Sequence, residues 1–175
     1  DLLDVYIYKD EIYITGKKNI GDKIFLEIVK GRFDNNKINF ESVIKLSSEN
    51  CIRKFPHVAG KVQIFNDDKN KILLTLNQGG WADNPSLENL SLDSVCGKIL
   101  LVDTKNNSYE IYSSGHRNIA GLYADENVII STEHGPYGGD EINLIEEDKN
   151  YGWDIASYGK KYSTLEDEGE YKDHL

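Results

Sequence analysis

The sequence has 175 residues, of which 39% are hydrophobic and 29% are charged, and its formal net charge at pH 7 is −10. This length suffices for one domain with a hydrophobic core, and no apolar run is long enough to span a membrane. The negative charge argues against nucleic acid or an anionic membrane as a partner, because both repel an acidic surface. Carboxylates can instead hold hard cations such as calcium.

Four short strands are predicted near the start of the chain, over residues 5–8, 12–15, 23–30 and 37–45. These segments alternate β-branched or aromatic residues with polar ones, which is the pattern of a strand with one buried face. Turn-forming residues such as Lys9-Asp10 and Asn35-Asn36 separate them. They predict one small antiparallel sheet.

A similar pattern recurs about every 55 to 60 residues, which is close to the length of a propeller blade. Strand pairs are predicted at 61–65 and 71–76 and again at 120–123 and 128–131, with 97–102 and 109–112 completing the second set. We therefore predict an all-β chain, one partial β-propeller domain over residues 1–175 with approximate blades at 1–50, 57–113 and 117–165. A propeller needs at least about four blades to close. The chain is thus expected to be part of a larger propeller, or to close by self-association, since an open edge invites pairing.

The two cysteines, Cys51 and Cys96, do not have the spacing of a zinc site. They could form a disulfide in an exported protein or remain two buried free thiols.

Two features of the second repeat are candidates for binding or chemistry. The glycine- and amide-rich segment 77–84 (NQGGWADN) directly follows a predicted inner strand, where it could contact a ligand or form a solvated turn. His57 lies at the entry to another inner strand. A histidine suits general-base catalysis at neutral pH, although a single histidine is more often structural.

Two polar, glycine-containing clusters follow, GHRN at 115–118 and EHGPYGGDE at 133–141. Arg117 and Asn118 offer a planar cationic fork and an amide, which suit carboxylate or quinone oxygens, or a salt bridge to one of the many acidic residues. In the second cluster, main-chain carbonyls and carboxylates favour calcium over zinc.

The combination GHRN…EHGPYGGDEIN…KNYGW resembles the soluble PQQ-dependent glucose and aldose sugar dehydrogenases, the glucose/sorbosone dehydrogenase family. The resemblance is strong over residues 115–162 and extends more loosely to His57-Val58-Ala59-Gly60-Lys61 and to Gly97-Lys98-Ile99-Leu100. It implies a six-bladed β-propeller that oxidises aldose sugars at C1 to lactones, with pyrroloquinoline quinone (PQQ) and calcium as cofactors. It also implies a periplasmic or secreted protein, with a small-molecule sugar as its substrate.

The resemblance also implies roles for single residues. His57 matches the family's catalytic base. The residues that match cofactor contacts are Arg117, Asn118, His134 and Tyr162. The residues that match calcium ligands are Gly135 and Pro136, through carbonyls, and the pair Glu141 and Tyr151.

The chain departs from the family at the position that usually carries an acid to orient the base, where it has Asn77-Gln78 and no carboxylate before Asp83. Loss of an orienting group can lower the rate while leaving binding intact. Two alternatives therefore stay open: a non-catalytic calcium-binding propeller that acts as a binding module, and a lactonase-like hydrolase that uses calcium.

Overall fold

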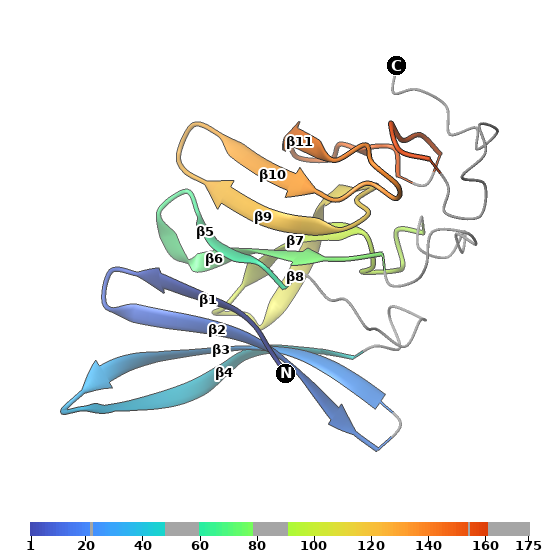
Figure 1. Cartoon of the computed structure of the whole chain (residues 1–175). Helices are drawn as coiled ribbons and strands as arrows, with labels where there is room; N and C mark the ends of the chain where they lie inside the picture. Colours follow the sequence, from blue (N-terminus) through green and yellow to red (C-terminus); the bar gives the residue numbers. More distant parts are fainter. Residues whose placement is uncertain (22, 48–59, 79–90, 154, 161–175) are drawn as a thin grey trace.

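The computed structural model describes residues 1–21, 23–47, 60–78, 91–153 and 155–160, and over these ranges the chain is all-β. Its strands form three antiparallel sheets in chain order, as Figure 1 shows. The first sheet contains β1 (Leu2–Tyr8), β2 (Glu11–Ile20), β3 (Lys23–Asp34) and β4 (Lys37–Ser47). The second contains β5 (Val62–Phe65), β6 (Asp68–Leu76), β7 (Lys98–Asp103) and β8 (Ser108–Ser114), and the third β9 (Ile119–Ala124), β10 (Ile129–Glu133) and β11 (Glu141–Leu144). In the described part of the chain, no helix is long and apolar enough to cross a membrane.

Tight turns connect neighbouring strands because their residues accept a left-handed backbone. Asn35 and Asn36 between β3 and β4 have φ of 45° and 66°, and Asn66 and Asp67 between β5 and β6 have φ of 51° and 55°. Asn and Asp tolerate this region better than other non-glycine residues, and hairpin turns with two such positions match the twist of the flanking strands. Each sheet is therefore a meander of sequential strands.

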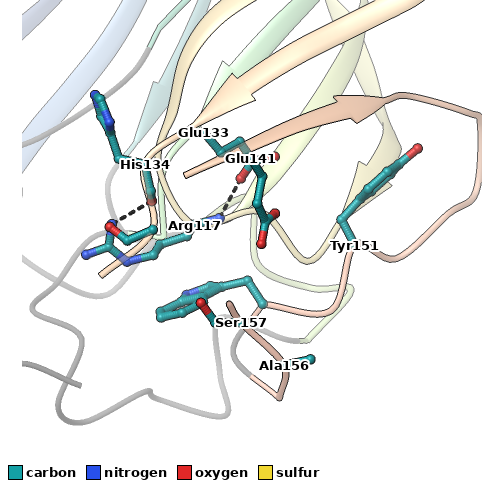
Figure 2. A pocket seen from close by; sticks show the side chains of 9 residues that line it. Arg117, Glu133, His134, Glu141, Tyr151, Ala156 and Ser157 are labelled. Atoms are coloured by element: carbon teal, nitrogen blue, oxygen red, sulfur yellow. Dashed lines mark hydrogen bonds between the residues drawn. The ribbon is translucent and has the colours of Figure 1, made fainter. Parts of the chain in front are cut away.

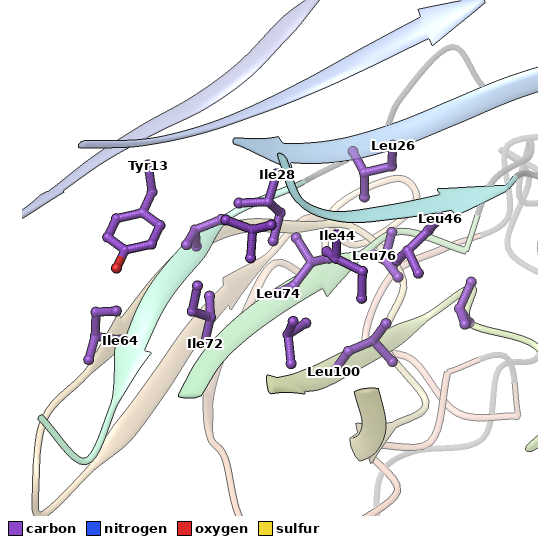
Figure 3. Packing of buried hydrophobic residues seen from close by; sticks show 14 of the residues in the cluster. Tyr13, Leu26, Ile28, Ile44, Leu46, Ile64, Ile72, Leu74, Leu76 and Leu100 are labelled. Atoms are coloured by element: carbon purple, nitrogen blue, oxygen red, sulfur yellow. The ribbon is translucent and has the colours of Figure 1, made fainter. Parts of the chain in front are cut away.

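The second sheet lies between the other two and is buried on both faces (Figure 1). Ile72, Leu74 and Leu100 point toward the first sheet and pack against residues such as Ile28 and Ile44 (Figure 3). The alternate residues of the same strands, Leu73, Ile99 and Leu101, pack instead against Ile119 and Ile129 of the third sheet. Because successive side chains of a strand point to opposite faces, one central sheet builds both cores.

Cys96 is fully buried and disulfide-bonded, so the alternative of free thiols is wrong for this residue. Cys51 lies outside the described residues. Cys96 also contacts Lys98, whose Nζ donates a hydrogen bond of 3.0 Å to the Cys96 carbonyl oxygen.

Lys98 is completely buried, and burial lowers its pKa to about 8. An unfolded lysine has a pKa of about 10.4, so between these two pH values the unfolded chain binds a proton that the folded chain does not. The free energy of unfolding should therefore rise as the pH increases from 8 to 10. We expect Lys98→Met to remove this rise, as measured by urea unfolding at several pH values. Lys105→Met, at an exposed position, is the control, and an equal slope in both variants would contradict the prediction.

Candidate functional site

Three segments far apart in the sequence meet at one end of the second and third sheets. The amide N–H of Gln78, after β6, donates to the carbonyl oxygen of Arg117 in the β8–β9 loop (3.1 Å). The N–H of His134, after β10, donates to the carbonyl oxygen of Asn118 (3.0 Å). The two polar clusters of the sequence are therefore neighbours in the structure.

The segment after β11 completes this region by bonding to the end of β8. Tyr151 N–H donates to the Ser114 carbonyl (2.9 Å), and Trp153 N–H donates to the Gly115 carbonyl (3.0 Å). The chain comes very close here because Gly115 has no side chain and adopts φ of 73°.

Gly115→Ala should strongly destabilise the fold. A Cβ at this position would lie 2.0 Å from Asn150 Oδ1 and 2.7 Å from Gly152 N, in addition to the strain of the left-handed backbone. We expect a loss of about 3–5 kcal/mol in unfolding free energy, the range in which single substitutions become exceptional. Gly21→Ala is the matched control, because Gly21 has φ of 60° but nothing within 4 Å of its Cβ position. The control should lose only the strain of about 1–2 kcal/mol, and equal losses in urea unfolding would refute the steric explanation.

A buried, hydrogen-bonded pair of side chains joins the two clusters. His116 Nδ1 lies 2.6 Å from Glu133 Oε1, and both side chains are almost completely inaccessible. His116 Nε2 lies 2.8 Å from Ser113 Oγ, and the imidazole stacks on the Tyr151 ring at a centroid distance of 4.9 Å. Burial raises the pKa of Glu133, but hydrogen bonds and the charge of His116 outweigh it and hold the pKa below its ordinary value. Glu133 is therefore ionised at neutral pH.

The order Ser113–His116–Glu133 resembles a hydrolytic triad in its distances, but its burial excludes that chemistry. The exposed fractions of these residues are 1%, 0% and 5%. A nucleophile must reach its substrate, and Ser113 Oγ has no access to solvent. The arrangement therefore serves the structure of the site.

Arg117 carries the polar network from this buried pair to the surface. Its main-chain N–H donates to Glu133 Oε2 (3.0 Å), and its guanidinium Nη1 donates to the carbonyl oxygens of His134 and Gly135 (both 2.7 Å). The guanidinium also lies 5.3 Å from the centre of the Trp153 ring. Trp153 Nε1 in turn donates to Gln78 Oε1. Arg117 is thus held from both ends, with its guanidinium directed into the second cluster.

A small pocket opens beside Arg117, and Glu133 and Glu141 are among the residues that line it (Figure 2). Its other walls come from the loop after β10 and the segment after β11, namely His134, Gly135, Tyr151, Trp153, Ala156 and Ser157. The cavity volume is about 10 Å³, enough for a single water-sized occupant such as an ion. A quinone would have to lie outside this pocket.

Several residues of this pocket offer oxygen atoms of the kind that calcium prefers. In the described part of the chain, no three His, Cys, Asp or Glu side chains form a metal-binding group. A cation would therefore depend on main-chain carbonyls together with the Glu141 carboxylate, and oxygen-only ligands of this kind suit calcium. The Gly135 carbonyl already accepts from Arg117, but a carbonyl oxygen has a second lone pair.

Asn77 occupies the position where the family resemblance implies an acid. It is buried, and its Nδ2 donates to Asn118 Oδ1. The residue thus contacts the amide that we predict to bind the quinone, and it fixes the orientation of that amide.

The remaining predicted site residues do not take part in this hydrogen-bond network through their side chains, or lie outside the described residues. His57 and Tyr162 lie outside the described residues. The His134 side chain is exposed and points away from the pocket, with Nδ1 3.5 Å from Asp140 Oδ2 (Figure 2). Pro136 is buried against Gly159, and Tyr151 uses its hydroxyl to bond the main chain at Leu144 and Glu146.

Four residues are central to the structure but were not singled out from the sequence: Ser113, His116, Glu133 and Trp153. In the sequence, residues 133–141 form one polar cluster, whereas in the structure Glu133 is the last residue of β10 and only residues 134–140 connect it to β11. The alternation of Ile129, Ser131 and Glu133 was the available signal, because it places Glu133 on the buried face of the strand.

Comparison with known proteins relates this arrangement to a family. Residues 2–174 match the family model described as Glucose / Sorbosone dehydrogenase. The chain is 48% identical over 56 residues to an aldose sugar dehydrogenase of Escherichia coli, an alignment that covers 31% of this chain and 15% of that protein. It is 46% identical over 50 residues to quinoprotein glucose dehydrogenase B of Acinetobacter calcoaceticus, which covers 27% of this chain and 10% of that protein.

Solved structures show the same fold over nearly the whole chain. A glucose dehydrogenase crystal structure superposes with a TM-score of 0.71 at 23% identity, covering 99% of this chain and 55% of that one. The apo form of the E. coli soluble aldose sugar dehydrogenase gives a TM-score of 0.65 at 26% identity, covering 88% and 48%. The PQQ-bound aldose sugar dehydrogenase of Streptomyces coelicolor gives 0.59 at 21% identity, covering 94% and 48%.

The chain therefore spans about half the length of the solved relatives, and its sequence alignments with the curated relatives cover only 15% and 10% of those proteins. The fold comparison confirms the predicted fold class, an all-β propeller of the six-bladed type of which this chain covers about half. Together with the family match over almost every residue, it leads to one conclusion: the chain belongs to the glucose/sorbosone dehydrogenase family.

Proposed function

We propose that this chain is part of a PQQ- and calcium-dependent dehydrogenase that oxidises aldose sugars at C1 to lactones. The observation that carries the proposal is the contact of Arg117 with the carbonyls of His134 and Gly135. It joins the two clusters that carry the family resemblance, one suited to a quinone and the other to calcium. The names of the relatives, a quinoprotein and a PQQ-bound enzyme among them, support the same cofactor.

Each predicted residue has a part in this proposal. Arg117 and Asn118 bind the polar edge of the quinone, where a guanidinium stabilises developing negative charge. His57 removes the proton of the sugar's C1 hydroxyl as the C1 hydride leaves and the C1–O bond becomes a carbonyl. When bound, PQQ supplies the acceptor for that hydride. His134 and Tyr162 are further cofactor contacts.

The calcium ligands are the carbonyls of Gly135 and Pro136 near the quinone, and the pair of the Glu141 carboxylate and the Tyr151 main chain. The mixture of carbonyl and carboxylate oxygens around the small pocket supports this assignment.

Removal of calcium by a chelator should lower the thermal midpoint of the protein, because an ion that binds only the folded state stabilises it. Readdition of calcium should restore the midpoint.

We propose that the three sheets belong to blades at residues 1–50, 57–113 and 117–165. Apolar side chains are exposed on the outer face of the third sheet, where Ile142 is 79% and Leu144 is 59% exposed. Val5 and Ile7 are 62% and 66% exposed on the first sheet. Further blades of a longer chain would cover these faces, and self-association is the other means of covering them; sedimentation analysis distinguishes the two.

The disulfide at Cys96 supports a periplasmic or secreted location, where such bonds persist.

Reconstitution tests the proposal. The full-length protein should oxidise aldoses in a dye-linked assay when both PQQ and calcium are present, and omission of either should abolish turnover. Absence of turnover together with an unchanged quinone absorbance would refute it.

A second candidate is a non-catalytic calcium-binding propeller that acts as a binding module. The amide of Asn77 in place of the family's acid favours it. Calorimetry decides between the two, because this alternative predicts calcium binding without PQQ binding.

A further inference from the structure

We propose that Glu133 and His116 are positioning residues that act on PQQ binding through Arg117. The inference rests on the proposed function, since it assumes that Arg117 contacts the quinone. Neither Glu133 nor His116 has a role of its own in the proposed sugar oxidation.

Glu133 is the centre of this network because all of its hydrogen bonds converge from buried or half-buried donors. Its Oε1 accepts from His116 Nδ1 (2.6 Å), from Asn143 Nδ2 (3.0 Å) and from Ser131 Oγ (3.3 Å). Three donors on one oxygen leave the carboxylate little freedom to rotate. Its second oxygen, Oε2, is thereby aimed at the main-chain N–H of Arg117 at 3.0 Å.

The contacts of Arg117 then close a ring. Its main chain is bonded to the Glu133 side chain, while its guanidinium bonds the carbonyls of His134 and Gly135, the next two residues after Glu133. The arginine is therefore fixed at its backbone and at its tip to the same short stretch of chain. Release of the backbone contact would let the guanidinium leave its place beside the pocket.

His116 holds the Glu133 carboxylate and the start of the loop that carries Arg117. The imidazole lies between Ser113 Oγ (2.8 Å) and Glu133, and it stacks on Tyr151. Because His116 directly precedes Arg117, the same buried ring anchors the start of the loop that carries the guanidinium. A buried ionised group also needs partners, so loss of one of them leaves the carboxylate under-bonded.

A double-mutant cycle separates positioning from a general structural effect, since coupling appears only between residues that act through each other. We would measure the dissociation constant of PQQ at saturating calcium for the full-length protein, Glu133→Gln, Arg117→Ala and the double variant. Thermal midpoints would be recorded in parallel. We expect Glu133→Gln to weaken PQQ binding about tenfold in the native background and less than about twofold when Arg117 is already alanine.

Three other results would each overturn a part of this proposal. An equal loss in both backgrounds, or native affinity in Glu133→Gln, would overturn the positioning role while leaving the proposed function intact. Native affinity in Arg117→Ala would instead overturn the role of Arg117 in the proposed function. If Glu133→Gln does not fold, Ser131→Ala provides the second variant, because it removes one donor to Glu133 Oε1 and keeps the Glu133 carboxylate, His116 and Arg117. Its smaller loss of affinity, about two- to threefold, should likewise require Arg117.

Discussion

Arg117→Ala should weaken PQQ binding by about 10- to 100-fold. A hydrogen bond to a charged group contributes about 1.5–3 kcal/mol, which corresponds to this range of affinity. In the proposed site the guanidinium provides such a contact, and it is held ready by the carbonyls of His134 and Gly135 and by the Trp153 ring. The measurement is a titration of the full-length protein with PQQ at saturating calcium, followed by the quinone absorbance.

Two controls make this result specific. Arg117→Lys keeps the charge but loses the planar fork, so it should fall between alanine and the native protein. Arg32→Ala removes an arginine of the first sheet that pairs with Glu11 at 2.8 Å, and it should leave PQQ affinity unchanged. An equal loss of affinity in Arg32→Ala and Arg117→Ala would show a nonspecific charge effect and contradict the assignment.

Most of the strands could be predicted because their pattern is local. Alternation in residues 5–8 and 12–15 and the turn residues Asn35-Asn36 correctly predicted the first sheet. The predicted strands were too short where side chains become polar, as at Lys17 and Lys18, which continue β2 by pairing with Leu26 and Phe25. Main-chain pairing with a neighbour extends a strand beyond its apolar residues, and a single segment carries no sign of that neighbour.

β11 is a strand that the sequence pattern did not predict at all. Residues 141–144 follow a polar, glycine-containing stretch, and no strand was predicted there. In the structure they pair with β10, with Thr132 opposite Ile142. Ile142 and Leu144 are exposed, so burial within this chain does not mark the strand.

The site was predictable in its clusters but not in its internal contacts. The composition of 115–118 and 133–141, together with the family resemblance, led us to predict a quinone-binding and a calcium-binding segment. These roles stay predictions, and the structure places the two segments side by side. The pairing of His116 with Glu133 spans 17 residues, and nothing in the spacing distinguishes it from other pairs. The replacement of the expected acid by Asn77 was visible in the sequence, but its contact with Asn118 was not.

His57→Gln should lower the turnover of the reconstituted enzyme by about 100- to 10,000-fold, the range that general-base catalysis contributes. Glutamine has a similar size but cannot accept the C1 hydroxyl proton at neutral pH. The expected loss lies toward the lower end of this range, because Asn77 stands where the family resemblance implies an acid that orients the base, and the native rate should already be reduced.

The decisive comparison is between turnover and cofactor affinity. If His57 acts only on the proton, the PQQ dissociation constant should remain within about twofold of the native value. His174→Gln, the same substitution in the acidic tail of the sequence, should change neither quantity. Native turnover in His57→Gln would mean that another group removes the proton, whereas a loss of PQQ affinity equal to the loss of turnover would make His57 a cofactor ligand and exclude it as the base.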